Sequence, residues 1–318
     1  MSLLGPDSRY LLRVAVWARL KERPEEGADG GGGRRGLRWA VGLAVAVMVL
    51  AVGGFVLFDR ARPYLHGTGC EVRTTQGTMP LDLEQAANAA TISAVAFRKR
   101  LPERAVVIAY ATAIQESHIR NLPGGDRDSV GMFQQRPSQG WGTPDKLRDP
   151  VQSTSKFFDA LVKVKDYLDR DLHDAAQRVQ RSADGTAYAQ HEPDGKLLAA
   201  AFTGREPATA RCWFPPDKKT ESRRPAAIRE MRRAFGSRLK VAGPSPLTQG
   251  APSDPAKWNS VKASTPREGW AVASWAVAHA QAYGLTEVRY AGKHWKSDAG
   301  HDGWTEDEDA PKDAVIVQ

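Results

Sequence analysis

The chain has 318 residues and a formal net charge of +8 at pH 7. Such a charge attracts anionic partners, for example nucleic acids, acidic wall polymers or lipid headgroups. No helix-turn-helix, RNP-like or zinc-finger pattern accompanies it, so the sequence argues against a nucleic-acid-binding protein.

The first 58 residues predict a membrane anchor. Residues 1–38 are expected to form a cytoplasmic segment that ends in the basic run Arg34-Arg35-Gly36-Leu37-Arg38. Residues 39–58 contain no charged or strongly polar side chain, and 20 such residues match the length a helix needs to cross a bilayer. No small-x-small cleavage site follows them. We therefore expect an uncleaved single-pass anchor with the chain after residue 58 outside the cell membrane.

A helical domain is predicted at residues 70–214, after a short spacer at 59–69. About 145 residues suffice for a single hydrophobic core. Helix-start signals recur through this region, at Asp82, Pro102, Asp149-Pro150 and Leu172. The helix after Pro102 carries an apolar run from Val106 to Ile114, and we expect the run from Asn121 to Gly125 to end it.

The remainder of the chain predicts a connector and a small accessory module. Residues 215–257 contain a basic helix at 217–240, which either attracts anionic polymers or forms a solvated face, and a proline-rich linker at 241–257. Residues 258–318 predict an α/β module with a helix at 270–283. Strands are expected at 287–290 and 314–317. Several of its side chains lack the spacing of a metal motif and are interpreted as surface residues, so no metal site is predicted: His279, His294, His301, Asp298 and Asp302.

The residues that point most directly to a reaction surround Glu116. This residue lies in the run Ala113-Ile114-Gln115-Glu116-Ser117, at the end of the apolar helix, and the run Gly131-Met132-Phe133-Gln134-Gln135 follows. A carboxylic acid donates a proton to a glycosidic oxygen only while it stays protonated, and burial against apolar groups raises its pKa. We therefore predict that Glu116 is a general acid facing a cleft.

The segment after Glu116 predicts the lining of that cleft. Gln134 and Gln135 carry amides that suit the hydroxyl and N-acetyl groups of sugars, although they could instead cap turns. Trp141 lies between two glycines and could either stack on a sugar ring or pack in the core.

A Glu-Ser pair followed by Gly-x-x-Gln resembles the soluble lytic transglycosylases and their lysozyme-like relatives, in particular their membrane-anchored actinobacterial forms. The resemblance covers about 145 residues. It implies a mainly α fold, namely a lysozyme-like helical domain with a small β-hairpin or loop, here preceded by one transmembrane helix and followed by the α/β module. It also implies cleavage of the MurNAc-GlcNAc β-1,4 bond of peptidoglycan, with Glu116 as acid and then base and without a cofactor. The implied partners are peptidoglycan glycan strands and cell-wall or secretion machinery proteins. The residues expected to contact substrate are Ser117, Gly131, Phe133, Gln134, Gln135, Trp141 and Tyr188.

Three alternatives remain open at the level of sequence. Asp126 or Asp128 could act as a second carboxylate, which would make the enzyme a muramidase, although both also suit a turn. The family's Ala-Tyr-Asn-Ala-Gly-like run is replaced here by Ala201-Phe202-Thr203-Gly204, and Tyr188 could supply the missing tyrosine. This departure also permits a catalytically idle glycan-binding scaffold in the wall or in a secretion or conjugation assembly.

The two cysteines, Cys70 and Cys212, bracket the predicted helical domain. An even number of cysteines outside the cell favours a disulfide over two free thiols. The resemblance implies the same pairing.

Overall fold

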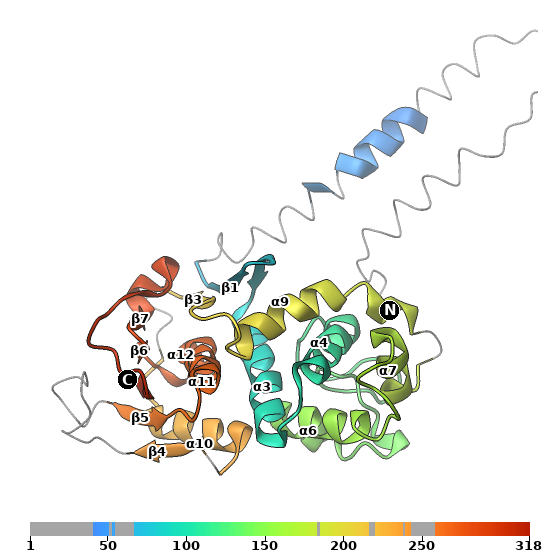
Figure 1. The fold of residues 1–318 in the computed structure, drawn as a ribbon. Helices are drawn as coiled ribbons and strands as arrows, with labels where there is room; N and C mark the ends of the chain where they lie inside the picture. Colours follow the sequence, from blue (N-terminus) through green and yellow to red (C-terminus); the bar gives the residue numbers. More distant parts are fainter. Residues whose placement is uncertain are drawn as a thin grey trace, which may run out of the picture. The chain divides into compact units, whose positions relative to one another are not determined.

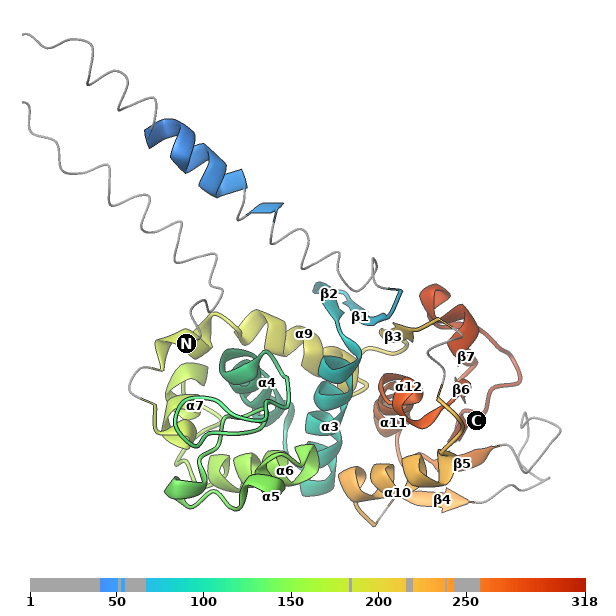
Figure 2. The same cartoon turned by 180° about the vertical axis from the view of Figure 1, so that it is seen from behind.

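The computed structural model describes residues 41–50, 53–54, 67–182, 185–215, 220–237, 239–242 and 258–318. One compact unit extends from Pro63 to Gln318 and contains both sheets and the candidate site. Figures 1 and 2 show it from two opposite sides.

The prediction of a transmembrane helix at residues 39–58 is overturned. Within this run the structure describes residues 41–50 and 53–54 as helical, and the rest of it, like residues 1–38, lies outside the described residues. In the part of the chain that the structure describes, no helix is long and apolar enough to span a membrane.

The helices of the compact unit fall in three stretches of the chain. The first stretch contains α3 (Leu83–Lys99), α4 (Glu103–Ser117), the 3-10 helix η1 (Pro137–Gln139), α5 (Pro144–Leu147), α6 (Pro150–Leu161), α7 (Leu172–Gln180), α8 (Thr186–Ala189) and α9 (Glu192–Phe202). The second contains α10 (Arg224–Phe235), and the third contains α11 (Pro266–Ala278), α12 (Ala280–Tyr283) and the 3-10 helix η4 (Ser297–Asp302).

The prediction of a mainly α fold is wrong, because the described residues form two antiparallel sheets and are about half helical with 16% strand. The first sheet has the strand order β2-β1-β3, from β2 (Gly77–Leu81), β1 (Gly69–Thr74) and β3 (Ala210–Trp213). The second has the order β4-β5-β9-β6-β7-β8. Its strands are β4 (Lys240–Ala242), β5 (Asn259–Lys262), β6 (Glu287–Tyr290), β7 (Lys293–Lys296), β8 (Thr305–Glu306) and β9 (Ala314–Val317). The predicted strands at 287–290 and 314–317 are confirmed as β6 and β9.

Helix α3 lies at the centre of the unit. It contacts α4, α6 and α9 on one side and α10 and α11 on the other, as both views show (Figures 1 and 2). Its sequence suits this position, because it is buried without interruption from Asn88 to Ala96 and is rich in alanine, which lets neighbouring helices approach closely. The predicted start at Asp82 is confirmed, since Asp82 and Gln85 form a reciprocal capping box.

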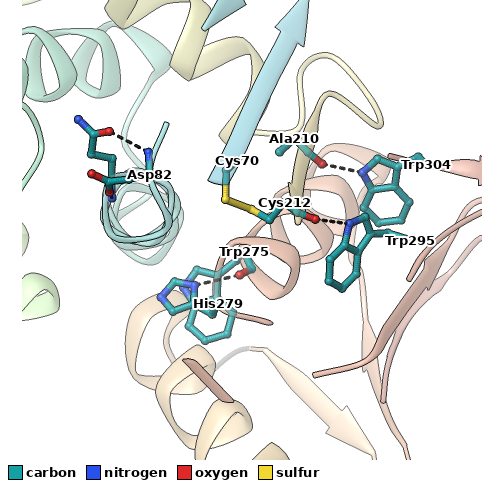
Figure 3. Close-up of a disulfide and its surroundings, with 9 residues drawn as sticks. Cys70, Asp82, Ala210, Cys212, Trp275, His279, Trp295 and Trp304 are labelled. Carbon is teal, nitrogen blue, oxygen red and sulfur yellow. Dashed lines mark hydrogen bonds between the residues drawn. A yellow bond between two sulfur atoms is a disulfide. The ribbon is translucent and has the colours of Figure 1, made fainter. Parts of the chain in front are cut away.

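The region expected to be an accessory module packs directly on this helical region. Helix α11 contacts both α3 and β3. Two tryptophans also attach the C-terminal region to β3 (Figure 3): Trp295 Nε1 donates to the Cys212 carbonyl at 3.2 Å, and Trp304 Nε1 donates to the Ala210 carbonyl at 2.8 Å. The linker residues 243–257 lie outside the described residues.

The predicted helix at 270–283 begins earlier, at Pro266, and is interrupted at His279 between α11 and α12. The interpretation of His279 as a surface residue is wrong, because only 8% of it is exposed. Its ring stacks on Trp275, and its Nδ1 lies 2.9 Å from the Trp275 carbonyl oxygen (Figure 3). Burial disfavours the imidazolium and lowers the pKa of His279 to about 4.

The predicted disulfide is confirmed between Cys70 and Cys212, which face each other across β1 and β3 (Figure 3). Disulfides persist in oxidising environments. The bond is therefore compatible with an extracellular location.

The predicted basic helix corresponds to α10, within the described residues 220–237. Several of its arginines are engaged inside the molecule. Arg233 pairs with Asp149 and Glu230, and Arg224 donates to the Asn259 side chain. Part of the basic charge of this segment therefore holds α10 in place.

Candidate active site

Glu116 lies in the last turn of α4, next to a sharp change of chain direction. The helix is buried from Ala105 to Ile114, as its apolar sequence predicts. It ends at Ser117, earlier than the expected stop near Asn121, because His118 and Ile119 both adopt left-handed backbone conformations, with φ of 54° and 62°. A β-branched residue rarely adopts this conformation, which costs about 1–3 kcal/mol.

Two amides from α3 hold this strained turn in place. Gln85 Nε2 donates to the His118 carbonyl at 2.9 Å, and Asn88 Nδ2 donates to the Ile119 carbonyl at 2.7 Å. Asn88 is buried, and so is Ile119. The position of the Glu116 backbone is therefore fixed from both sides, by its own helix and by α3.

The surroundings of Glu116 favour the protonated form of its carboxyl. Burial raises the pKa of Glu116 because a carboxylate loses hydration there, and side-chain hydrogen bonds from Gln180 and Tyr188 offset only part of this effect. The Tyr188 hydroxyl lies 2.7 Å from Glu116 Oε1. The pKa of Tyr188 is itself raised, by burial first and then by the neighbouring Glu116 charge, so this hydroxyl remains a hydrogen-bond donor at neutral pH.

Glu116 lines a cleft with a volume of about 440 Å³. The other lining residues are mostly amides, hydroxyls and charged groups, with one tryptophan: Asp126, Ser129, Gln134, Gln135, Arg136, Gln139, Trp141, Gln180, Arg181 and Ser182. Of the residues predicted to form the site, the structure brings Glu116, Asp126, Gln134, Gln135 and Trp141 together in this cleft.

Gln134 and Gln135 occupy different environments in the cleft wall. Gln134 has a left-handed backbone, and its side chain bridges Ser129 Oγ and the Gly131 carbonyl, both at 2.9 Å. Gln135 is 2% exposed, and its Nε2 donates to the Ser153 carbonyl at 3.3 Å. The buried Oε1 of Gln135 has no hydrogen-bond partner among the residues that the structure describes, which leaves one polar group in the wall of the cleft unsatisfied there.

Three residues predicted to contact substrate instead shape the loop that forms the cleft. Ser117 is buried and its Oγ donates to the Met132 carbonyl at 2.7 Å, which fastens α4 to the loop. Gly131 has a φ of 78°, and a Cβ there would lie 2.2 Å from the Leu147 carbonyl oxygen. Phe133 is fully buried and stacks on Phe157 at a ring-centroid distance of 4.5 Å.

Tyr188 also lies outside the lining of the cleft, although its hydroxyl contacts the Glu116 carboxyl. It comes from α8, whereas the run Ala201-Phe202-Thr203-Gly204 lies at the end of α9 and serves a different purpose. Thr203 accepts hydrogen bonds from Arg267, and a Cβ at Gly204 would lie 2.2 Å from the Arg267 carbonyl oxygen. This run therefore forms the junction with α11, and the tyrosine beside Glu116 is Tyr188.

The two candidate second carboxylates differ in their surroundings. Asp128 accepts hydrogen bonds from the Ser138 backbone and from Arg136, which lower its pKa to about 2. Asp128 therefore stays ionised, and its hydrogen bonds to Arg136 and Ser138 hold the loop together. Asp126 lines the cleft, but its side chain is 89% exposed and its nearest cation is Arg127, at 3.8 Å.

Three further residues, which the sequence did not predict to belong to the site, extend the cleft from the end of α7: Gln180, Arg181 and Ser182. Gln180 also donates to the Phe133 carbonyl at 2.7 Å, so it connects Glu116 to the loop. The sequence predicts the start of this helix at Leu172, and Val179 belongs to its buried face. The only sequence signal for these residues was the position of the polar Gln180, directly after the buried Val179.

The sequence shows no match to any protein-family model or to any curated protein. Among the described residues, no cluster of three or more His, Cys, Asp or Glu side chains could hold a metal ion.

Proposed function

We propose that this protein cleaves the glycan strands of peptidoglycan as a lytic transglycosylase, with Glu116 as general acid and then general base. The observation that carries the proposal is a carboxyl with a raised pKa, fixed by Tyr188 and α3, at the wall of a cleft lined by amides and a tryptophan. Amides suit the N-acetyl and hydroxyl groups of sugars, and the tryptophan offers a flat apolar face to a ring.

The proposed reaction requires one carboxyl. Protonated Glu116 donates its proton to the glycosidic oxygen, and the bond from that oxygen to C1 of the muramic acid breaks with an oxocarbenium-like transition state. The resulting Glu116 carboxylate, hydrogen-bonded by Tyr188, accepts the proton of the muramic acid C6 hydroxyl while O6 bonds to C1. The products are a strand with a 1,6-anhydro end and a strand with a free 4-hydroxyl, and no water is consumed.

The environment of the two aspartates supports transglycosylation over muramidase chemistry. Asp128 is engaged by Arg136 and Ser138, which leaves it poorly placed to activate water. Asp126 is exposed to solvent, where its charge is screened.

The test is digestion of purified peptidoglycan by the full chain, with products identified by mass spectrometry. We expect anhydromuropeptides from the wild type and a fall in rate of at least about 10²-fold for Glu116→Gln, the lower end of what general acid–base catalysis contributes. Glu308→Gln, which neutralises an exposed carboxylate, is the matched control and should cleave normally. Reducing-end products would indicate a muramidase instead. Glycan binding without cleavage by any of the three proteins would favour an idle glycan-binding scaffold.

A further inference from the structure

A second chamber adjoins the Glu116 cleft. It has a volume of about 700 Å³ and is lined by residues of α6, of α7 and of the turn after α6. Gln139, Trp141 and Arg181 line both spaces, so a ligand in the cleft can extend past Trp141 into the chamber.

The chamber carries positive charge that the protein does not neutralise. Lys156, Lys163 and Arg181 line it, and none of them has an ion pair or side-chain hydrogen bond with the residues that the structure describes. The other charged groups of the lining are paired. Arg178 binds Asp174 at 2.9 Å, and Asp159 binds Lys99 at 2.6 Å.

The same chamber also exposes apolar surface. Val162 and Val164 are part of its lining, and 48% of Val162 is exposed. Trp141 forms the boundary with the cleft. A ligand that suits this lining combines at least one anionic group with short aliphatic groups.

We propose that the chamber binds the acidic peptide stem of the muramic acid residue, so that the enzyme selects glycan strands that carry stems. The inference rests on the proposed function, which places a muramic acid in the adjoining cleft. Removal of the stem by an amidase leaves one lactyl carboxylate directly on the muramic acid ring, but it removes the further carboxylates that extend away from the sugar. The stem branches from the sugar and carries carboxylates and small aliphatic side chains, which complement the unpaired cations, the exposed Val162 and the partly buried Val164.

The experiment measures binding instead of turnover, so its outcome is separate from that of the digestion assay. Soluble glycan strands are prepared with their peptide stems or with the stems removed by an amidase. Their affinities are measured by calorimetry with three full-length proteins: Glu116→Gln alone, Glu116→Gln with Lys156→Gln and Lys163→Gln, and Glu116→Gln with Lys262→Gln and Lys312→Gln. Lys262 and Lys312 are exposed on and beside the second sheet, so the last protein controls for the loss of two charges.

We expect Glu116→Gln to bind stem-bearing strands roughly three- to tenfold more tightly than stripped strands, as two exposed charge pairs allow. This preference should shrink with added salt. It should be absent from the Lys156 and Lys163 variant and present in the Lys262 and Lys312 control, while all three proteins bind stripped strands equally.

Equal affinity of Glu116→Gln for both strands would overturn the inference, as would a preference that survives loss of Lys156 and Lys163. A preference only for strands that carry phosphate-rich wall polymers would also overturn it, and would assign the chamber to those polymers. If the stem preference holds while the wild type cleaves nothing, the inference stands and the proposed function fails. If neither strand binds, both fail.

Discussion

Opening the disulfide between Cys70 and Cys212 should cost the protein much of its stability. The two cysteines are separated by 142 positions in the sequence, so the bond restricts a long loop of the unfolded chain. The chain-entropy relation gives about 5 kcal/mol at 25 °C for a loop of this length, and removal of native disulfides typically costs about 2–5 kcal/mol. We therefore expect a loss near the upper end of this range.

The assay is urea unfolding of oxidised and reduced wild type, followed by tryptophan fluorescence. Trp295 is a useful probe because its Nε1 donates to the carbonyl of Cys212 itself. With a urea m-value of about 2.5 kcal/mol per molar, the midpoint should fall by about 2 M on reduction. Reduction leaves both sulfurs in place, so the shift reports the covalent link and not lost packing.

The control is Cys70→Ala with Cys212→Ala, which should unfold near the reduced wild type and should not respond to reductant. A reduced protein whose midpoint lies within about 0.3 M urea of the oxidised one would refute the reasoning. That result would mean that the ends of the loop stay close in the unfolded chain without the bond.

Three further predictions concern the surroundings of Glu116. Tyr188→Phe removes a hydrogen bond that favours the Glu116 carboxylate, so the pKa of Glu116 should rise further. The alkaline limb of the pH–rate profile should then move to higher pH. An alkaline limb at the same or a lower pH would contradict this role of Tyr188. Asn88→Ala leaves the buried Ile119 carbonyl without its donor and should lower the free energy of unfolding by about 1–3 kcal/mol, as measured by urea titration. Asp128 has a lowered pKa, so its contribution to stability is present above pH ~4 and is lost as the pH falls through about 2. Melting temperatures recorded across this range should show that loss in the wild type and not in Asp128→Asn.

The sequence predicted the local helix starts well, because each depends on a few neighbouring residues. Asp82 forms a capping box with Gln85, and the Asp149 side chain accepts from two backbone N–H groups at the start of α6. Helix ends were less predictable. Helix α4 ends at Ser117 because α3 holds two left-handed residues in place, and no local pattern records a contact with a different helix.

The sheets were missed for a different reason. Strands β4, β5, β7 and β8 are two to four residues long, too short for an alternating pattern to stand out. Their pairing is also largely non-local, since β5 lies between β4 and the last strand of the chain, β9. The apolar run at 39–58 was assigned to the membrane from its composition and length alone, and the described residues contain no helix long and apolar enough to span a membrane.

The motif around Glu116 shows why a sequence pattern locates a site better than it assigns roles within it. Ser117 and Gly131 belong to the motif, and in the structure both constrain the loop that follows α4. Ser117 attaches this loop to α4 through the Met132 carbonyl. Gly131 allows the close approach of the Leu147 backbone, which a side chain would block. The hydroxyl that contacts the Glu116 carboxyl and affects its pKa belongs to Tyr188, which is 72 positions away in the sequence on a helix of only four residues. The run at 201–204 therefore does not weigh against the proposed role of Glu116, because Tyr188 already contacts its carboxyl.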